Sequence, residues 1–111
     1  MPQPAAKAVT QQSLSMLGTF EVLFSFLSVK GTHTDTQPIQ NLPEGVQEAT
    51  IALQAFNVEY ADKKQFGFGE FRIDLSLGNR RRNASCRVTL RDDTDNRLWE
   101  GTVKAIVTFF G

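Results

Sequence analysis

Polar and apolar residues alternate along much of this chain with a period of two, the pattern of half-buried β-strands. The clearest case is the stretch from Asn83 to Phe110, where the polar segment 92–96 separates two alternating runs. Short polar side chains favour turns because they bond to their own backbone. The pattern therefore predicts one long β-hairpin. Its predicted apolar face comprises Ala84, Cys86, Val88, Leu90, Trp99, Val103, Ala105, Val107 and Phe109.

Residues 19–30 form a second alternating run, but they carry apolar side chains on both faces, with Phe24 on one and Leu23 on the other. This indicates a strand that is covered on both sides, by a second sheet and by a partner subunit. Residues 31–45 contain two prolines and mostly polar side chains, so they are predicted to form a turn-rich connection.

Two more strands are predicted in the middle of the chain, and each changes phase once. Residues 46–60 switch phase near Ala55-Phe56, and the run that ends at Leu77 switches at Gly69. One extra residue restores the inward direction of a strand, so each switch predicts a β-bulge. The segment 78–83 is predicted to be a tight basic turn.

Five strong strands, one weaker candidate near the N-terminus and no helix predict an all-β protein, an antiparallel β-sandwich of about six strands. Residues 1–12 are predicted to form a flexible N-terminal arm, and residues 13–111 a single β-sandwich domain. The nine phenylalanines are more than the interior of one small sandwich easily covers, which predicts a homo-oligomer.

The charges of the chain balance, with 12 Lys and Arg against 12 Asp and Glu, so no nucleic acid and no membrane is expected as a partner. The longest apolar stretch, residues 20–29, is too short to span a bilayer as a helix. No signal peptide is recognisable, and the single Cys86 cannot form an internal disulfide. These features predict a cytoplasmic protein, and secretion without a signal peptide stays open.

The sequence carries no catalytic signature, and we expect no enzyme, no metal and no cofactor. His33 is the only histidine, whereas common metal sites need several His or Cys ligands. The carboxylates of residues 92–96 do not have the spacing of a calcium loop. The arginines at positions 80–82, close to Arg87, form either a solvated turn or a local anion site.

Three parts of the chain share a pattern with a known family: Ile51–Glu59, Phe71–Leu75, and Ala84–Thr94 together with Val103–Phe109. In these segments the chain resembles the H-type lectins, small proteins first known from snail agglutinins and from the C-terminal domain of slime-mould discoidins. The resemblance implies a six-stranded antiparallel sandwich. It also implies assembly as a trimer, or as a hexamer of two trimers, that binds carbohydrate of the N-acetylgalactosamine type at subunit boundaries.

The same resemblance implies which residues contact the sugar. Arg72 matches the arginine of a family strand and can make bidentate bonds to hydroxyl groups. Arg91, Asp92 and Asp93 follow the position of the family's turn tryptophan. Leu90 stands where that tryptophan is expected.

Two functional hypotheses follow from these observations. The first is a non-enzymatic carbohydrate-binding module that acts as a homo-oligomer. The second is a structural or assembly protein, such as a particle or phage component, that uses an oligomeric β-sandwich without binding a ligand.

Overall fold

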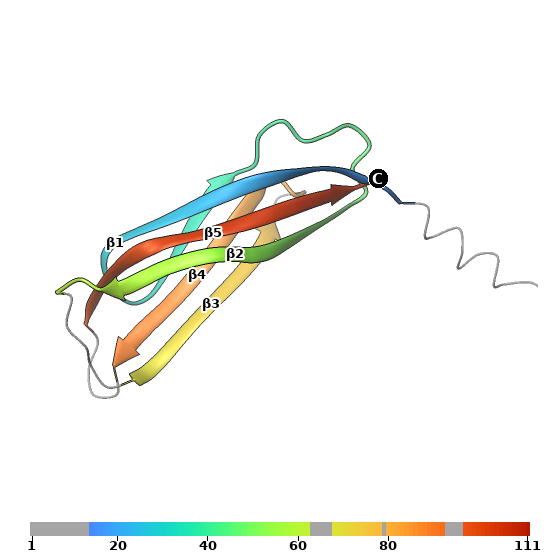
Figure 1. Cartoon of the computed structure of the whole chain (residues 1–111). Helices are drawn as coiled ribbons and strands as arrows, with labels where there is room; N and C mark the ends of the chain where they lie inside the picture. The colour runs from blue at the N-terminus through green and yellow to red at the C-terminus, as the bar shows by residue number, and fades with distance from the viewer. Residues whose placement is uncertain (1–13, 63–67, 79, 93–96) are drawn as a thin grey trace, which may run out of the picture.

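The computed structural model describes residues 14–62, 68–78, 80–92 and 97–111. These residues form five strands joined by antiparallel pairing into one sheet, in the order β2-β5-β1-β4-β3, and the sheet curls into a half-barrel (Figure 1). The strands are β1 (Met16–Pro38), β2 (Glu48–Tyr60), β3 (Phe68–Gly78), β4 (Asn83–Asp92) and β5 (Leu98–Phe110).

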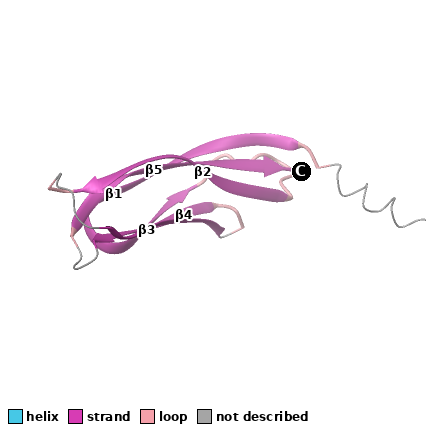
Figure 2. Cartoon of the chain, turned by 60° about the horizontal axis from the view of Figure 1, so that its bottom comes forward, coloured by secondary structure: helices cyan, strands magenta, loops and turns pink. Residues whose placement is uncertain are grey.

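The long strand β1 belongs to both sides of the half-barrel because it bends in its middle. Its first part, up to Lys30, pairs with β5, and its second part, from Gly31, pairs with β4. At the bend Ser28 and Gly31 have positive φ angles of 50° and 64°, which straight strands do not adopt. The half-barrel therefore has a first layer (β2, β5 and residues 16–30) and a second layer (residues 31–38, β4 and β3), as Figure 2 shows.

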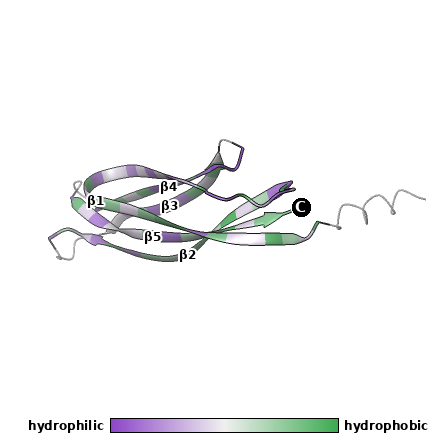
Figure 3. Cartoon of the chain, turned by 90° about the horizontal axis from the view of Figure 1, so that it is seen from above, coloured by the Kyte–Doolittle hydropathy of each residue, from purple (hydrophilic) through white to green (hydrophobic). Residues whose placement is uncertain are grey.

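The core lies between the inner faces of the two layers. Along β3, β4 and β5 apolar residues alternate with polar ones, and the hydropathy changes along the ribbon accordingly (Figure 3). Trp99 is fully buried beside the bend of β1, where its ring lies 5.2 Å from that of Phe26 and its indole N–H donates to the carbonyl oxygen of Gly31 at 3.0 Å. The buried apolar residues are Val22, Phe24, Phe26, Ile39, Ala84, Cys86, Val88, Trp99, Val103, Ala105, Val107 and Phe109.

The predicted hairpin between residues 83 and 110 is wrong in its pairing, although its alternation is confirmed. β4 and β5 do not pair with each other, because β1 lies between them in the sheet. Leu90 pairs with Gly31 and Leu98 pairs with Lys30, so β4 ends and β5 begins at the bend of β1. The bent strand thus takes the pairing partners that a local hairpin would have joined. Of the predicted turn, Asp92 ends β4, and residues 93–96 lie outside the described residues.

The connection predicted over residues 31–45 is also wrong in its first half, because β1 continues to Pro38. The inward positions there are polar, namely His33, Asp35 and Gln37, so no apolar alternation marks the strand. Asp35 has a specific partner: its Oδ2 accepts a hydrogen bond from the backbone N–H of Ser25 at 3.0 Å. This bond joins the second part of β1 to the first part across the bend.

Several expectations are confirmed. The register shifts between Leu53 and Ala55 and between Phe68 and Glu70, which places the two predicted bulges, and Gly78 pairs with Asn83 across the predicted turn. The all-β, antiparallel character is confirmed. The described residues form a half-barrel of five strands, and the predicted sandwich of about six strands is not confirmed. The predicted arm of residues 1–12 lies outside the described residues.

The strand predicted to be apolar on both faces is covered on one face only within the chain. Phe24 is fully buried, but Leu23 is 54% exposed and Leu27 is 80% exposed. The second face of this strand was also predicted to be covered. The described part of this chain does not cover it.

We predict that Trp99→Phe lowers the free energy of unfolding by about 1–3 kcal/mol, because the partly buried carbonyl of Gly31 loses its donor. Urea unfolding followed by far-ultraviolet circular dichroism measures this change without relying on tryptophan fluorescence. Leu98→Ala, at the exposed neighbouring position, is the control and should change stability by less than about 0.5 kcal/mol. Equal stabilities of Trp99→Phe and the natural protein would contradict the assigned role.

Candidate functional site

The outer face of the second layer carries a continuous polar surface, which we call the polar face. Alternation turns the odd residues of β4 and the even residues of β3 outward, because their neighbours Ala84, Cys86 and Val88 are buried. Antiparallel register then sets the outward residues in rows across the three strands. The polar face comprises Thr32, Thr34, Thr36, Glu70, Arg72, Asp74, Ser76, Ser85, Arg87, Thr89 and Arg91.

At the centre of the polar face one carboxylate lies between two guanidinium groups. Asp74 Oδ2 is 3.0 Å from Arg72 Nε and 3.6 Å from Arg87 Nη2. Both arginine side chains are more than half exposed, and exposed ion pairs contribute only about 0–1 kcal/mol to stability. The arrangement therefore does little for the fold and leaves donors and an acceptor available to a ligand.

A shallow hollow of about 410 Å³ lies beside this ion-pair cluster. All the described side chains that line it are polar, and two neighbouring hydroxyl pairs are held by hydrogen bonds. Thr32 and Thr89 bond at 2.6 Å, and Thr36 and Ser85 bond at 2.8 Å. The lining residues are Thr34, Asp74, Ser76, Ser85 and Arg87. The hollow thus presents fixed hydroxyl, carboxylate and guanidinium groups to the solvent.

The structure separates the residues predicted to bind a ligand. Arg72 and Arg91 both lie on the polar face, where Arg91 pairs with Glu70 at 3.5 Å. Asp92 lies on the opposite face with 2% exposure, and its Oδ2 is 3.0 Å from Arg97 Nε. Asp93 lies outside the described residues. Of the predicted set, only the two arginines are therefore placed together on one surface.

The set of ligand-binding residues predicted from the sequence did not include Asp74 or Arg87, although Arg87 was considered beside a local anion site at residues 80–82. The signal was present, because Asp74 shares the outward phase of Arg72 two residues away. The missing information was the pairing of Asp74 with Arg87, since strand register across a hairpin depends on the turn and the bulge that flank it.

The basic turn after β3 is a separate feature. Arg80 and Arg81 have φ angles of 56° and 66°, as a tight hairpin turn requires, and the carbonyl of Arg82 accepts from the N–H of Ile39 at 2.7 Å. Arg87, which was considered as part of an anion site with this turn, is instead engaged with Asp74 on the polar face.

A second hollow of about 410 Å³ lies on the outer face of the first layer. Glu59 and Glu100 are directly opposite each other there, on β2 and β5. Phe26 and Leu27 add apolar surface, and the described lining contains no basic side chain. The polar face offers both signs of charge and ordered hydroxyls, so it is the stronger candidate.

Two further observations concern chemistry. Among the described residues no group of three His, Cys, Asp or Glu side chains is placed to hold a metal ion. The described part of the chain also has no helix long and apolar enough to cross a membrane.

Cys86 is buried behind the polar face, and burial, followed by the charges of Asp35 and Asp74, raises the pKa of its thiol to about 11. We therefore predict that iodoacetamide at pH 8 alkylates Cys86 at least about 100-fold more slowly in the folded protein than in urea, because only the thiolate reacts. The folded state holds the thiol proton more tightly than the unfolded state does. The contribution of Cys86 to the stability of the fold is therefore fully present below pH 9, the ordinary pKa, and is lost as the pH rises towards 11. Mass spectrometry of timed samples measures the rate, and fast alkylation of the folded protein would contradict the burial.

Comparison with known proteins finds no matching family model, no similar curated protein and no similar solved structure. The resemblance to the H-type lectins therefore stays a prediction from the sequence.

Proposed function

We propose that this protein is a non-enzymatic carbohydrate-binding module and that the polar face is its binding surface. The observation that carries the proposal is the cluster of Arg72, Asp74 and Arg87 beside a hollow whose described lining residues are all polar. The proposal retains Arg72 and Arg91 from the predicted set and adds Asp74 and Arg87.

The chemistry of the hollow favours a ligand rich in hydroxyl groups. An apolar ligand would strip water from the charged and hydroxyl groups without replacing their hydrogen bonds, which is unfavourable. A sugar offers a donor and an acceptor at each hydroxyl, so it can bond to guanidinium, carboxylate and side-chain hydroxyl groups together. Three arginines against two acids on the polar face give it a net positive charge, which favours a sugar that carries an acidic group.

The same groups do not favour hydrolysis of a bound sugar. Glycoside hydrolysis generally uses two carboxyl groups that flank the scissile bond. The described lining of the hollow contains one carboxylate, Asp74, which is shared between two arginines. Binding without turnover is therefore the activity that the arrangement supports best.

Self-association would strengthen such binding. A shallow, exposed site holds one sugar weakly, and several sites on one assembly raise the overall avidity without any new contact. The proposed module is therefore expected to act as a homo-oligomer, with the trimer or hexamer implied by the resemblance as one form.

A structural or assembly protein is the second candidate, and the exposed apolar residues favour it. Leu27 is 80% exposed and Phe56 is 50% exposed, which are unusual positions for large apolar side chains unless another surface covers them. This candidate predicts self-association and no sugar binding.

We predict that the protein binds a related set of sugars on a glycan array, and that free sugar competes for this binding. Arg72→Ala and Arg87→Ala should each weaken the binding, measured by isothermal titration calorimetry with the best sugar, by at least about tenfold, the effect of losing one charge-assisted hydrogen bond. Arg91→Ala should have a smaller effect, because Arg91 pairs with Glu70, which does not line the hollow, whereas Arg72 pairs with Asp74, which does.

Lys104→Ala is the matched control. Lys104 is an exposed cation of the first layer, so this variant should bind sugar as the natural protein does. A glycan array without reproducible binding at high protein concentration would refute the proposal and favour the assembly protein. Equal affinities of the Arg87→Ala and Lys104→Ala variants would refute the assignment of the polar face.

A further inference from the structure

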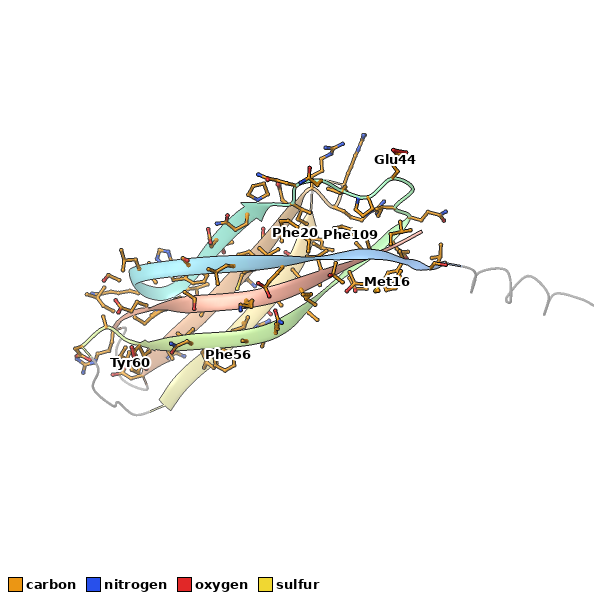
Figure 4. All side chains as sticks on the ribbon, turned by 45° about the horizontal axis from the view of Figure 1, so that its top comes forward. Met16, Phe20, Glu44, Phe56, Tyr60 and Phe109 are labelled. Carbon is orange, nitrogen blue, oxygen red and sulfur yellow. The ribbon has the colours of Figure 1, made fainter. Side chains whose placement is uncertain are left out.

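The sheet of the half-barrel has two free edges, because β2 and β3 are the first and last strands of the sheet order. Neither strand pairs on its outer edge within the described chain, so each edge presents backbone groups that can accept another strand. At one place the two strands approach each other, where the rings of Phe56 and Phe71 lie 5.3 Å apart. The side chain of Phe56, labelled on β2 in Figure 4, is nevertheless half exposed.

The free edge of β3 is regular over a defined length. A bulge at Gly69 ends the regular pairing at one end, since the register with β4 shifts between Phe68 and Glu70. At the other end the register with β4 holds as far as Gly78, which pairs with Asn83 across the turn. The regular stretch therefore runs from Glu70 to Gly78, and Ile73 is the central residue of the whole strand Phe68–Gly78.

We infer that the edge of β3 is the docking surface for a second copy of this chain, which adds its own β3 antiparallel about a two-fold axis at Ile73. In this register Arg72 lies opposite Asp74 of the partner subunit, and Asp74 opposite the partner subunit's Arg72. On the inner face Phe71 lies opposite Leu75 of the partner subunit. Opposite charges in directly facing positions stabilise such pairs, and a symmetric contact repeats each one twice.

Neighbouring registers are disfavoured by the same charges. An axis at Arg72 places Arg72 opposite Arg72 of the partner subunit, and an axis at Asp74 places the two aspartates opposite each other. An axis at Phe71 restores the opposite charges but leaves the last four residues of β3 without partners. The register centred on Ile73 is therefore the one that gives both Arg72 and Asp74 opposite charges and keeps the whole strand paired.

This pairing also covers the exposed apolar residues of β2. The two-fold axis of an antiparallel strand pair is perpendicular to the sheet, so the first layers of both copies lie on the same side of the joined sheet. The two copies of β2 then flank the axis. Leu53 and Phe56, which face inward on β2 and are 45% and 50% exposed, lie on the side that faces the partner. The polar faces of both copies stay open on the opposite side.

Charge reversal tests the inference directly. The natural protein should sediment as a dimer or a larger even-numbered assembly at micromolar concentration. Arg72→Asp places aspartates opposite each other twice and should raise the dissociation constant at least about 100-fold. The double variant Arg72→Asp with Asp74→Arg restores opposite charges and should restore the dimer. Lys104→Glu reverses an exposed charge of the first layer and should leave the mass unchanged.

A monomeric natural protein, a trimer, or an Arg72→Asp variant with the same mass as the natural protein would overturn the inference. A double variant that stays monomeric although it is folded by circular dichroism would overturn it as well. Because the measured quantity is mass, this test is separate from the sugar-binding test, in which Arg87→Ala lies on β4, away from the edge.

Disulfide cross-linking tests the register. Residues directly opposite across the axis have Cα atoms about 4.5–5.5 Å apart, within reach of a disulfide. With diamide as the oxidant, Ile73→Cys should therefore form covalent dimers. Ser76→Cys should not, because the two introduced cysteines would be about 20 Å apart at about 3.4 Å per residue. The natural Cys86 is buried and does not compete. Equal cross-linking of both variants, or of neither, would overturn the register.

Discussion

The bend of β1 at Ser28 and Gly31 is the constraint on which the rest of the structure depends. It allows one strand to serve both layers, so that β5 and β4 can follow each other along its length. Trp99 holds the bend from inside, with its indole N–H on the carbonyl of Gly31 and its ring against Phe26. A partly buried carbonyl that loses its donor destabilises the fold, so the tryptophan and the bend stabilise each other.

The two layers have different outer faces. In each strand the residues that point into the core fix which of their neighbours point outward. The second layer turns buried residues such as Cys86 and Val88 inward, and the alternating neighbours become the rows of charged and hydroxyl groups of the polar face. The first layer turns Phe24 inward and leaves Leu23 and Leu27 exposed. A polar surface and a surface with exposed leucines therefore lie on opposite sides of one small half-barrel.

The open edges of β2 and β3 give this fold a property that a closed barrel lacks. A closed barrel has no unpaired strand edge, whereas a half-barrel has two. On β3 the charges on the edge alternate in sign, from Glu70 through Arg72 to Asp74. Charges on an edge usually discourage pairing, but a pattern of this kind favours registers that bring opposite charges together and opposes the registers that bring like charges together.

The sequence by itself determined the all-β class, the inward and outward residues of β4 and β5, and both bulges, because a period of two is a local property of each strand. It also marked Arg72 and Arg91 as outward arginines. Only the tertiary structure decided that β1 separates β4 from β5, since the inward residues His33, Asp35 and Gln37 carry no apolar signal. It also decided that Asp92 is buried with Arg97 and that Arg87 joins Asp74. These outcomes depend on pairing between residues far apart in the chain, which alternation within one strand does not encode.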